Sequence, residues 1–267
     1  MAVATAVIIN AFLTDDFSIR YVAAESETLQ PLFYKITAYW GGLNGSIMFW
    51  VFLLSIFGSL AVAVNRERYR ELIPYVIATI NTVQMFFLYL MVVHKNPFTT
   101  YLSNAPAEGT GLNPLLQNYW MAIHPPSLYT GFVGMTIPFA FCIAALVTGH
   151  LDDSWLRAVR RWTMFSWLFL TFGLTLGMIW AYEELGWGGY WGWDPVENSS
   201  LIPWLICVAS IHTMMSQRRS GTFVRTNFVL SILCFIMVLY STFLTRSGVL
   251  GETSVHSFVD PGMWAYW

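Results

Sequence analysis

Six long apolar segments constrain the fold more than any other feature of the sequence. They lie near residues 44–65, 72–93, 124–148, 162–182, 198–216 and 226–246. A helix of about 20 apolar residues crosses a hydrocarbon core of roughly 30 Å. Residues 1–13 are also apolar, without the basic start of a signal peptide, and predict a short first helix. We therefore predict an all-α polytopic membrane protein with about seven transmembrane helices in a single integral membrane domain, residues 1–267.

The composition supports a membrane protein and excludes several other classes. The chain is 56% hydrophobic and 10% charged, with a mean hydropathy of +0.55. A net charge of −2 gives no attraction for nucleic acid. Cys142, Cys207 and Cys234 lie in apolar segments without CxxC spacing, which predicts buried thiols and no disulfide. The chain has no CxxCH motif, so it is not itself a c-type cytochrome.

Basic residues predict the orientation of the helices. Nine of the 13 Lys and Arg residues fall in three alternate loops, near residues 66–70, 157–161 and 218–225. Loops enriched in Lys and Arg stay in the cytoplasm. The outer loops are then 14–43, 94–123, 183–197 and 247–267, and we expect functional residues in them because they are the longer loops.

The loop at 183–197 belongs to a tryptophan-rich stretch, WAYEELGWGGYWGWDPVENSSLIPW, at residues 180–204. Glycines allow a backbone to approach a ligand closely, and aromatic rings offer stacking faces and N–H donors. The stretch therefore predicts a surface for a large planar ligand such as a porphyrin. The residues expected to form it are Trp187, Gly188, Gly189, Tyr190, Trp191 and Trp193.

A structural interpretation of the same stretch remains open. Trp and Tyr collect at membrane interfaces without binding anything. Asp194, Pro195 and Glu197 have the spacing of an N-cap, a first-turn proline and a capping box. Gly173 and Gly177 form a GxxxG pattern that favours close helix packing, although glycine is common in membrane helices anyway.

The motif WGGYWGWDPVEN resembles the "WWD" signature of haem-handling membrane proteins in cytochrome c biogenesis. FLTDDFSIRYVA, YKITAYWGGLNGS, NPLLQNYWMAIHPPSLYTGFVG and TRSGVLGETSVHSF are similar to motifs of the cytochrome c maturation F (CcmF) family, and the resemblance runs through nearly the whole chain. It implies a haem lyase component that holds haem b transiently at the periplasmic face. There the haem would be joined by thioether bonds to an apocytochrome c CxxCH motif, and partner subunits are expected to be needed for this activity.

The resemblance also assigns the histidines. By residue type alone, a lone histidine at a helix start is usually an interface residue. The family pattern makes His124 and His256 the axial ligands of the WWD haem and His212 a ligand of a transmembrane b-type haem. The family takes the second ligand of that haem from a later helix, so we expect this chain to be a fragment or a split subunit. His94 and His150 match no family position and are expected to be ordinary interface or loop residues.

The remaining site residues have less specific signals. Arg246 either pairs with a haem propionate or marks the membrane interface. Asp194 and Glu197 are expected to be mainly structural and to shape the pocket. No side chain is predicted to act as a catalytic acid, base or nucleophile.

The implied partners are a periplasmic haem chaperone, apocytochrome c with its thiol-handling chaperones, the remaining half of the lyase, and quinol. The expected location is the bacterial inner membrane, or the mitochondrial inner membrane if the source is organellar. Two other functions remain open. One is a haem exporter or carrier without ligation chemistry, and the other is a transporter whose aromatic loop is only an interface belt.

Overall fold

The computed structural model describes residues 1–258. The regular secondary structure of this range is helical, with one isolated β-bridge between Ile19 and Thr100. Within it, six helical segments are long and apolar enough to cross a membrane. They are α4 (Leu43–Asn65), α5 (Ile73–Tyr89) with its π-helical end η1 (Leu90–His94), α6 (Tyr119–Gly134) continued by α7 (Thr136–Thr148), α8 (Ser154–Glu184), α9 (Pro195–Ser220) and α10 (Val224–Arg246). The all-α polytopic class is confirmed. The seventh predicted span, α1 (Ala2–Leu13), is a helix of 12 residues, too short to be counted with the others.

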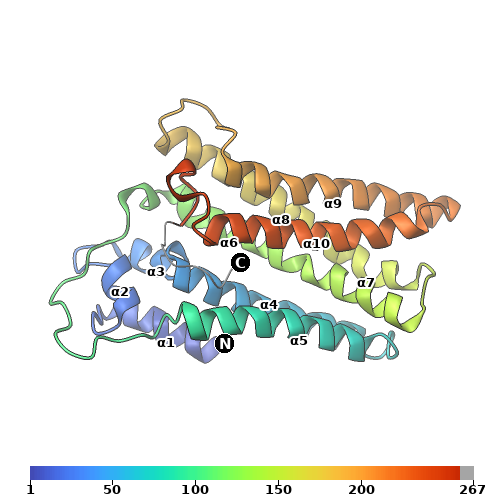
Figure 1. Ribbon diagram of the computed structural model, residues 1–267, viewed down its shortest axis with the longest axis horizontal. Coiled ribbons are helices and arrows are strands. Elements are labelled where there is room, and N and C mark those ends of the chain that lie inside the picture. Colours follow the sequence, from blue (N-terminus) through green and yellow to red (C-terminus); the bar gives the residue numbers. More distant parts are fainter. Residues whose placement is uncertain (259–267) are drawn as a thin grey trace.

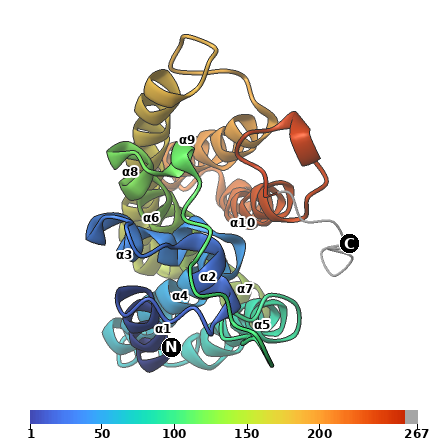
Figure 2. The ribbon, with the colours of Figure 1, turned by 90° about the vertical axis from the view of Figure 1, so that its left-hand side faces the viewer.

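The two ends of the bundle carry different loops. The long helices run along the long axis of Figure 1, and the three arginine-rich connections, α4–α5, α7–α8 and α9–α10, all lie at its right-hand end. The tryptophan-rich connection α8–α9 and the segment after α10 lie at the opposite end. Figure 2 turns that end toward the viewer. This is the grouping of loops that the charge pattern predicted, and we call the end without the arginine loops the outer end.

Short helices in the outer connections were not foreseen from the sequence. α2 (Arg20–Glu25) and α3 (Leu32–Gly41) fold within the predicted 14–43 loop, η2 (Pro114–Leu116) precedes α6, and η3 (Gly251–Thr253) follows α10. A partly buried ion pair between Lys35 and Asp15, with Nζ and Oδ1 2.5 Å apart, ties α3 to the segment after α1. These helices give the outer end an ordered cover.

Several helices begin earlier than expected. α6 starts at Tyr119 rather than 124, because the Asn118 side chain accepts hydrogen bonds from the N–H groups of Trp120 and Met121. The helices expected at 162–182 and 198–216 extend to 154–184 and 195–220. The early start of α6 places Pro125 and Pro126 inside the helix rather than at its beginning.

The two prolines leave backbone carbonyls without a helical partner, because proline has no N–H. Pro126 cannot bond to the carbonyl oxygen of Ala122. That oxygen instead accepts a hydrogen bond of 3.0 Å from the indole Nε1 of Trp40, on α3. The proline interruption in the hydrogen bonds of α6 is thus coupled to Trp40 of α3, which lies 82 residues away in sequence.

Close packing of α6 on α8 depends on glycines of both helices. A Cβ at Gly173 would lie 2.7 Å from backbone atoms of Leu128, and one at Gly131 would lie 2.7 Å from Leu170. Contacts this short do not occur for real Cβ atoms, so a side chain at either position would separate the helices. The close helix approach predicted from the GxxxG spacing is confirmed.

Candidate functional site

A cavity of about 220 Å³ opens at the outer end, where α6, α8, α9 and α10 meet. His124 of α6 and His256 of the segment after α10 both line it, although 132 positions separate them in the sequence. Trp180 and Trp191 form part of its aromatic wall, and Arg246 lies at the end of α10 beside it. The structure thus brings both histidines predicted as axial ligands to one cavity.

His124 is held in a single orientation by α8. Its Nδ1 lies 2.7 Å from the carbonyl oxygen of Gly173, which can only accept a hydrogen bond, so Nδ1 carries the proton. The lone pair of the neutral ring is therefore on Nε2. A Cβ at Gly177 would lie 2.7 Å from Cε1 of His124 and 3.3 Å from Nε2. The two glycines of the GxxxG pattern therefore act differently on His124. The carbonyl of Gly173 orients the imidazole ring, and the missing side chain of Gly177 leaves space for it.

His256 is oriented by Asp194. Its Nδ1 lies 3.2 Å from Oδ1 of Asp194, in a poorly aligned contact. The hydroxyl of Ser254 donates to the same oxygen at 2.8 Å, and the His256 backbone N–H donates to Ser254 Oγ at 3.1 Å. Because a carboxylate accepts hydrogen bonds, this contact favours the proton on Nδ1 and the lone pair on Nε2, as in His124. The ring packs edge-on against Trp180, with centroids 5.2 Å apart.

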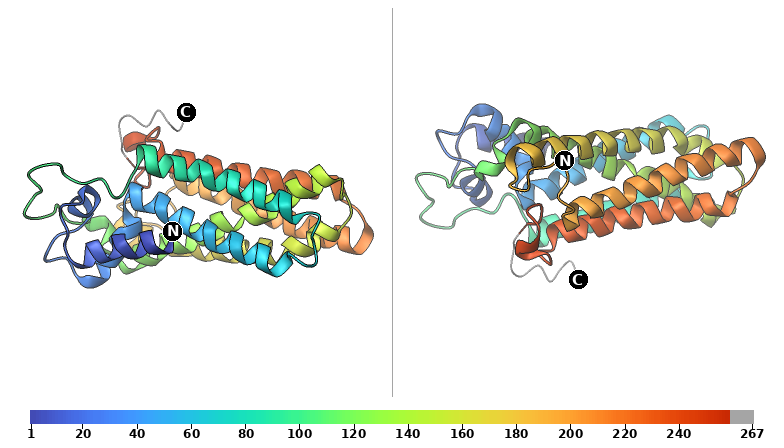
Figure 3. Two further views of the ribbon diagram at one scale, coloured as in Figure 1. Left: turned by 90° about the horizontal axis from the view of Figure 1, so that it is seen from below. Right: turned by 90° about the horizontal axis from the view of Figure 1, so that it is seen from above.

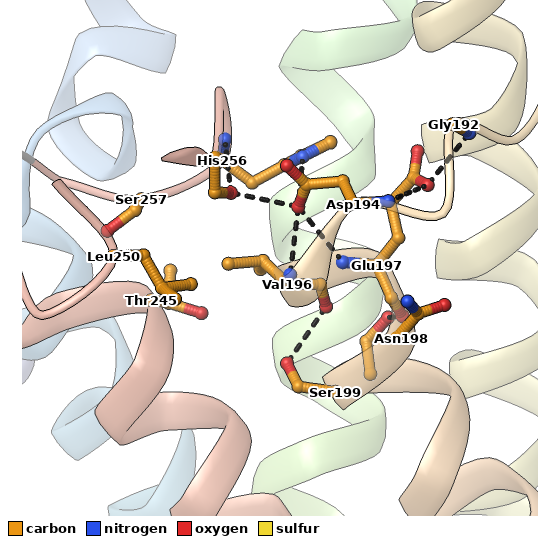
Figure 4. A network of polar contacts seen from close by, with 12 residues as sticks. Gly192, Asp194, Val196, Glu197, Asn198, Ser199, Thr245, Leu250, His256 and Ser257 are labelled. Carbon is orange, nitrogen blue, oxygen red and sulfur yellow. Dashed lines mark hydrogen bonds and ion pairs between the residues drawn. The ribbon is translucent and has the colours of Figure 1, made fainter. Parts of the chain in front are cut away.

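Asp194 also begins helix α9. Its Oδ1 accepts the backbone N–H of Val196 at 2.8 Å, and the Glu197 carboxylate accepts the N–H groups of Gly192 at 2.9 Å and Asp194 at 3.2 Å (Figure 4). The predicted capping box is present. Burial alone would raise the pKa of Asp194, but the contact with His256 and the hydrogen bonds from Ser254 and Val196 hold it below the ordinary value. One carboxylate therefore links the tryptophan loop, α9 and His256.

The tryptophan-rich loop contributes to the cavity less uniformly than its sequence suggested. Trp191 lines the cavity, and its Nε1 is buried without a hydrogen-bond partner among the described residues. The ring of Trp187 lies near that of His256, with centroids 6.5 Å apart. Its indole N–H donates a hydrogen bond of 3.1 Å to the carbonyl oxygen of Gly189. The indole of Trp187 packs against Gly192, where a Cβ would lie 2.7 Å away.

The other predicted members of this surface point elsewhere. Trp193 is 72% exposed and has a φ of 55°, which is uncommon for a residue other than glycine. It lines a separate apolar groove between α8 and α9 together with Trp191 and Trp204. Tyr190 stacks on Tyr182, with centroids 4.5 Å apart, and neither Gly188 nor Gly189 has another atom near its Cβ position.

Arg246 is the most unusual residue of the cavity. The side chain is buried, with 2% of the residue exposed, and its guanidinium lies over the rings of Tyr129, 5.0 Å from the centroid, and Trp50, 5.7 Å from the centroid. In the part of the chain that is described, it pairs with no carboxylate and its Nη2 has no hydrogen-bond partner. A buried cation without a counter-ion is costly, so the site is suited to an anionic ligand group. Sequence reasoning missed Trp50 and Tyr129, because aromatic residues inside apolar segments look like ordinary core.

The remaining histidines lie away from this cavity. His212 is exposed on α9, and its Nδ1 lies 2.8 Å from the carbonyl oxygen of Val208, which leaves Nε2 free. His94 packs edge-on against Tyr89, and His150 lies 3.1 Å from the Glu71 carboxylate.

The three cysteines are free and buried, as predicted. No group of three or more His, Cys, Asp or Glu residues suited to a metal ion occurs within residues 1–258.

The donor set of the cavity fits a haem. Two imidazoles would hold the iron through Nε2. The Nη2 of Arg246 and the indole N–H of Trp191, which have no hydrogen-bond partner within residues 1–258, suit propionates. The volume of about 220 Å³ is below the ~300–1000 Å³ of typical ligand sites. Part of the macrocycle would therefore lie outside the enclosed volume.

Known proteins resemble this chain closely. Residues 40–250 match the family model described as cytochrome c assembly protein. The cytochrome c-type biogenesis protein CcmF of Haemophilus influenzae is 41% identical over 98% of this chain, and CcmF of Escherichia coli is 44% identical over 96%. The ccl1 protein of Rhodobacter capsulatus is 44% identical over 97%.

A solved structure, of the cytochrome c haem lyase CcmF, superposes on 94% of the chain with a TM-score of 0.77 and 37% identity. The chain spans about two fifths of the length of these relatives, with 40% of the Haemophilus protein and 40% of the solved chain covered. The family match covers most of the chain, and the fold agrees with it. The chain therefore belongs to the cytochrome c assembly protein family and is a relative of CcmF within it.

Proposed function

We propose that this chain is the haem-holding part of a cytochrome c haem lyase. The observation that carries the proposal is the convergence of His124, His256 and Arg246 on one outer cavity, where Arg246 pairs with no carboxylate of the described residues. His124 and His256 would hold haem b through Nε2, and Arg246 and Trp191 would receive its propionates. Haem, when bound, supplies the vinyl groups to which the two thiols of an apocytochrome CxxCH motif are joined as thioethers.

The protein residues orient the reactants rather than transfer protons. Gly173 and Asp194 keep the Nδ1 protons in place, so that both lone pairs stay available at Nε2. Trp180 and Trp187 enclose the His256 ring and keep water from one side of it. Glu197 accepts the backbone N–H of Gly192 and so holds the α8–α9 loop, whose Trp191 would lie beside the haem.

We place a second haem at His212. Its imidazole is exposed on α9 inside a membrane-spanning segment, where an ionisable side chain is costly unless it has a partner. A second ligand from another helix would complete this b-type site. Electrons from quinol would reach the outer site through it.

The remaining assignments follow from the same function. A periplasmic haem chaperone would deliver haem, and apocytochrome c with its thiol-handling chaperones would present the CxxCH motif. The outer end would face the periplasm of a bacterial inner membrane, because the three arginine-rich loops lie at the other end. The segments that the relatives have in addition to this part would be supplied by a partner subunit or by the rest of a longer chain.

The lyase proposal is tested by covalent haem attachment. The chain, its partner subunits and an apocytochrome c are co-expressed, and haem that stays on the cytochrome after denaturing electrophoresis is measured. We expect attachment with the wild type and its loss with His124→Ala and His256→Ala, while His94→Ala behaves as the wild type. If the chain binds haem but attachment does not depend on it, the exporter or carrier function is the correct one.

The interface-belt alternative explains the tryptophans but not the polar interior of the cavity. An aromatic belt does not account for the buried guanidinium of Arg246, which has no counter-ion in the described part of the chain. If the purified protein carries no haem in the presence of its partners, this alternative replaces the lyase proposal.

A further inference from the structure

A second cavity, of about 480 Å³, lies between α4 and α5, on the face of the bundle away from α9 and α10. Figure 3 shows this face in its left panel, seen from below. The groove begins at Arg66, the C-cap of α4 in an arginine-rich loop, and runs into the membrane-spanning part of both helices. None of the residues assigned to haem lines it.

The middle of this groove contains polar groups at membrane depth. Ser59 and Asn81 are both exposed there, and within residues 1–258 neither side chain has a hydrogen-bond partner. An unpartnered amide in a bilayer is unfavourable and marks a contact with a polar group of another molecule. The deep end is closed, because Gln84 of α5 donates a hydrogen bond of 2.8 Å to Ser55 of α4.

The mouth of the groove is cationic. Arg70 forms an ion pair with Glu67, and Nε of Arg66 lies 3.7 Å from the same carboxylate. The Arg66 side chain is 70% exposed, which leaves its terminal nitrogens available. Basic pockets between helices on the cytoplasmic side suit the phosphates of anionic lipids.

The polar groups lie at the depth that a phospholipid requires. Ser59 precedes Arg66 by seven residues, which is about 10 Å along a helix. Ester carbonyls of a lipid lie below its phosphate and accept hydrogen bonds, which a serine hydroxyl and an asparagine amide can donate. Gly58, Leu54 and Ile80 then provide an apolar floor for an acyl chain.

We propose that the α4–α5 groove binds one anionic phospholipid of the cytoplasmic leaflet, with its phosphate on Arg66 and its ester carbonyls on Ser59 and Asn81. The groove matches the order of groups along such a lipid. The cation at the mouth suits the phosphate, the unpartnered donors below it suit the ester carbonyls, and the apolar floor suits an acyl chain. This site goes beyond the proposed haem function and does not depend on it.

Native mass spectrometry of the detergent-solubilised full chain tests the headgroup. Dioleoylphosphatidylglycerol and dioleoylphosphatidylcholine are titrated separately. We expect Arg66→Glu to weaken phosphatidylglycerol binding by about fivefold or more, the factor for one basic residue at an anionic lipid. Phosphatidylcholine binding should weaken by a smaller factor, because the choline cation offsets the charge of its phosphate. Arg68→Glu is the matched control, because Arg68 is in the same loop but lies over Tyr69, outside the groove.

Asn81→Leu tests the depth of the site. It should weaken the binding of both lipids by the same factor, because both carry ester carbonyls. Its control is Thr82→Val, since the Thr82 hydroxyl is already bonded to Ala78 of its own helix. Phosphatidylglycerol binding that is unchanged in Arg66→Glu, or equally weakened in Arg66→Glu and Arg68→Glu, would overturn the proposal. The first of these outcomes would assign the groove to a helix of another subunit.

Discussion

Single atoms decide the orientation of both histidines of the outer cavity. The Gly173 carbonyl and the Asp194 carboxylate each contact an Nδ1, which favours the lone pair on Nε2 in both rings. Neither contact could be foreseen from the sequence, because the partners lie 49 and 62 positions from their histidines.

Gly177→Ala tests the space that His124 needs. The new methyl group would lie 2.7 Å from Cε1 of the ring, so the imidazole must move away from its present position. We expect haem affinity to fall by about 10- to 100-fold, as for other changes that misorient a metal ligand. Haem titration followed by absorption measures it. Gly186→Ala is the control, because a Cβ there meets no atom within 4 Å, and equal affinities in the two variants would contradict the assigned role.

Glu25 gives a prediction about pH. Burial at the end of α2 raises the pKa of this carboxyl to about 7 from 4.5. The folded state therefore binds the proton more tightly than the unfolded state, and stability falls as pH rises from about 4.5 to about 7. We expect Glu25→Gln to raise the melting temperature at pH 8 and to leave it unchanged near pH 4.

The comparison for this test is Glu108→Gln, which should behave in the opposite way. Hydrogen bonds from Thr28 hold the pKa of Glu108 below its usual value, so its carboxylate stabilises the folded state above pH 4.5. Glu108→Gln should lower the melting temperature at pH 8. The same direction of change in both variants would contradict the account of Glu25.

At the scale of the elements, α6 owes its position to groups outside it. Its N-terminus is capped by Asn118, whose amide also donates to Glu183 and Glu184 at the end of α8. Its proline interruption is satisfied by Trp40 of α3. The outer helices therefore help to set the register of the helix that carries His124.

A double-mutant cycle on Trp40 and Pro126 tests this coupling. Trp40→Phe leaves the Ala122 carbonyl oxygen without a partner and should cost about 1–3 kcal/mol of stability. With Pro126→Ala in the background, the restored backbone N–H can bond that oxygen, so Trp40→Phe should cost less. Thermal unfolding in detergent measures the coupling. An equal cost of Trp40→Phe in both backgrounds would show that the hydrogen bond does not matter.

Much of the element structure could be predicted from the sequence, for identifiable reasons. Apolar length located the spans, and Asp194, Pro195 and Glu197 located the start of α9, because both signals are local. The start of α6 was misplaced because Pro125 and Pro126 suggested a boundary, whereas Trp40 and Asn118 supply the missing bonds from elsewhere in the chain. The buried surroundings of Arg246 were missed for the same reason, since Trp50 and Tyr129 come from distant helices.

The whole molecule separates its charges between its two ends. The three arginine-rich connections share one end, and the tryptophan-rich connection and the segment after α10 share the other. Such an asymmetry orients a multi-pass protein in its membrane.

Cysteine labelling with a membrane-impermeant maleimide tests this orientation in whole cells. Ser103→Cys, in the outer loop before α6, should react from outside, and Ser220→Cys, at the end of α9, should react only after the membrane is opened. Both positions are exposed, whereas the native cysteines are buried and should stay unlabelled. Labelling of Ser220→Cys in intact cells would reverse the predicted orientation.

The absorption spectrum of the purified protein tests the central claim most directly. The chain is expressed with its haem-delivery partners, and the wild type is compared with His124→Ala, His256→Ala, His212→Ala and the control His94→Ala. Two axial imidazoles predict a low-spin b-type spectrum that changes in His124→Ala and in His256→Ala, with a separate component lost only in His212→Ala. A wild-type spectrum retained in both His124→Ala and His256→Ala would contradict the claim that these two histidines hold haem at the outer cavity.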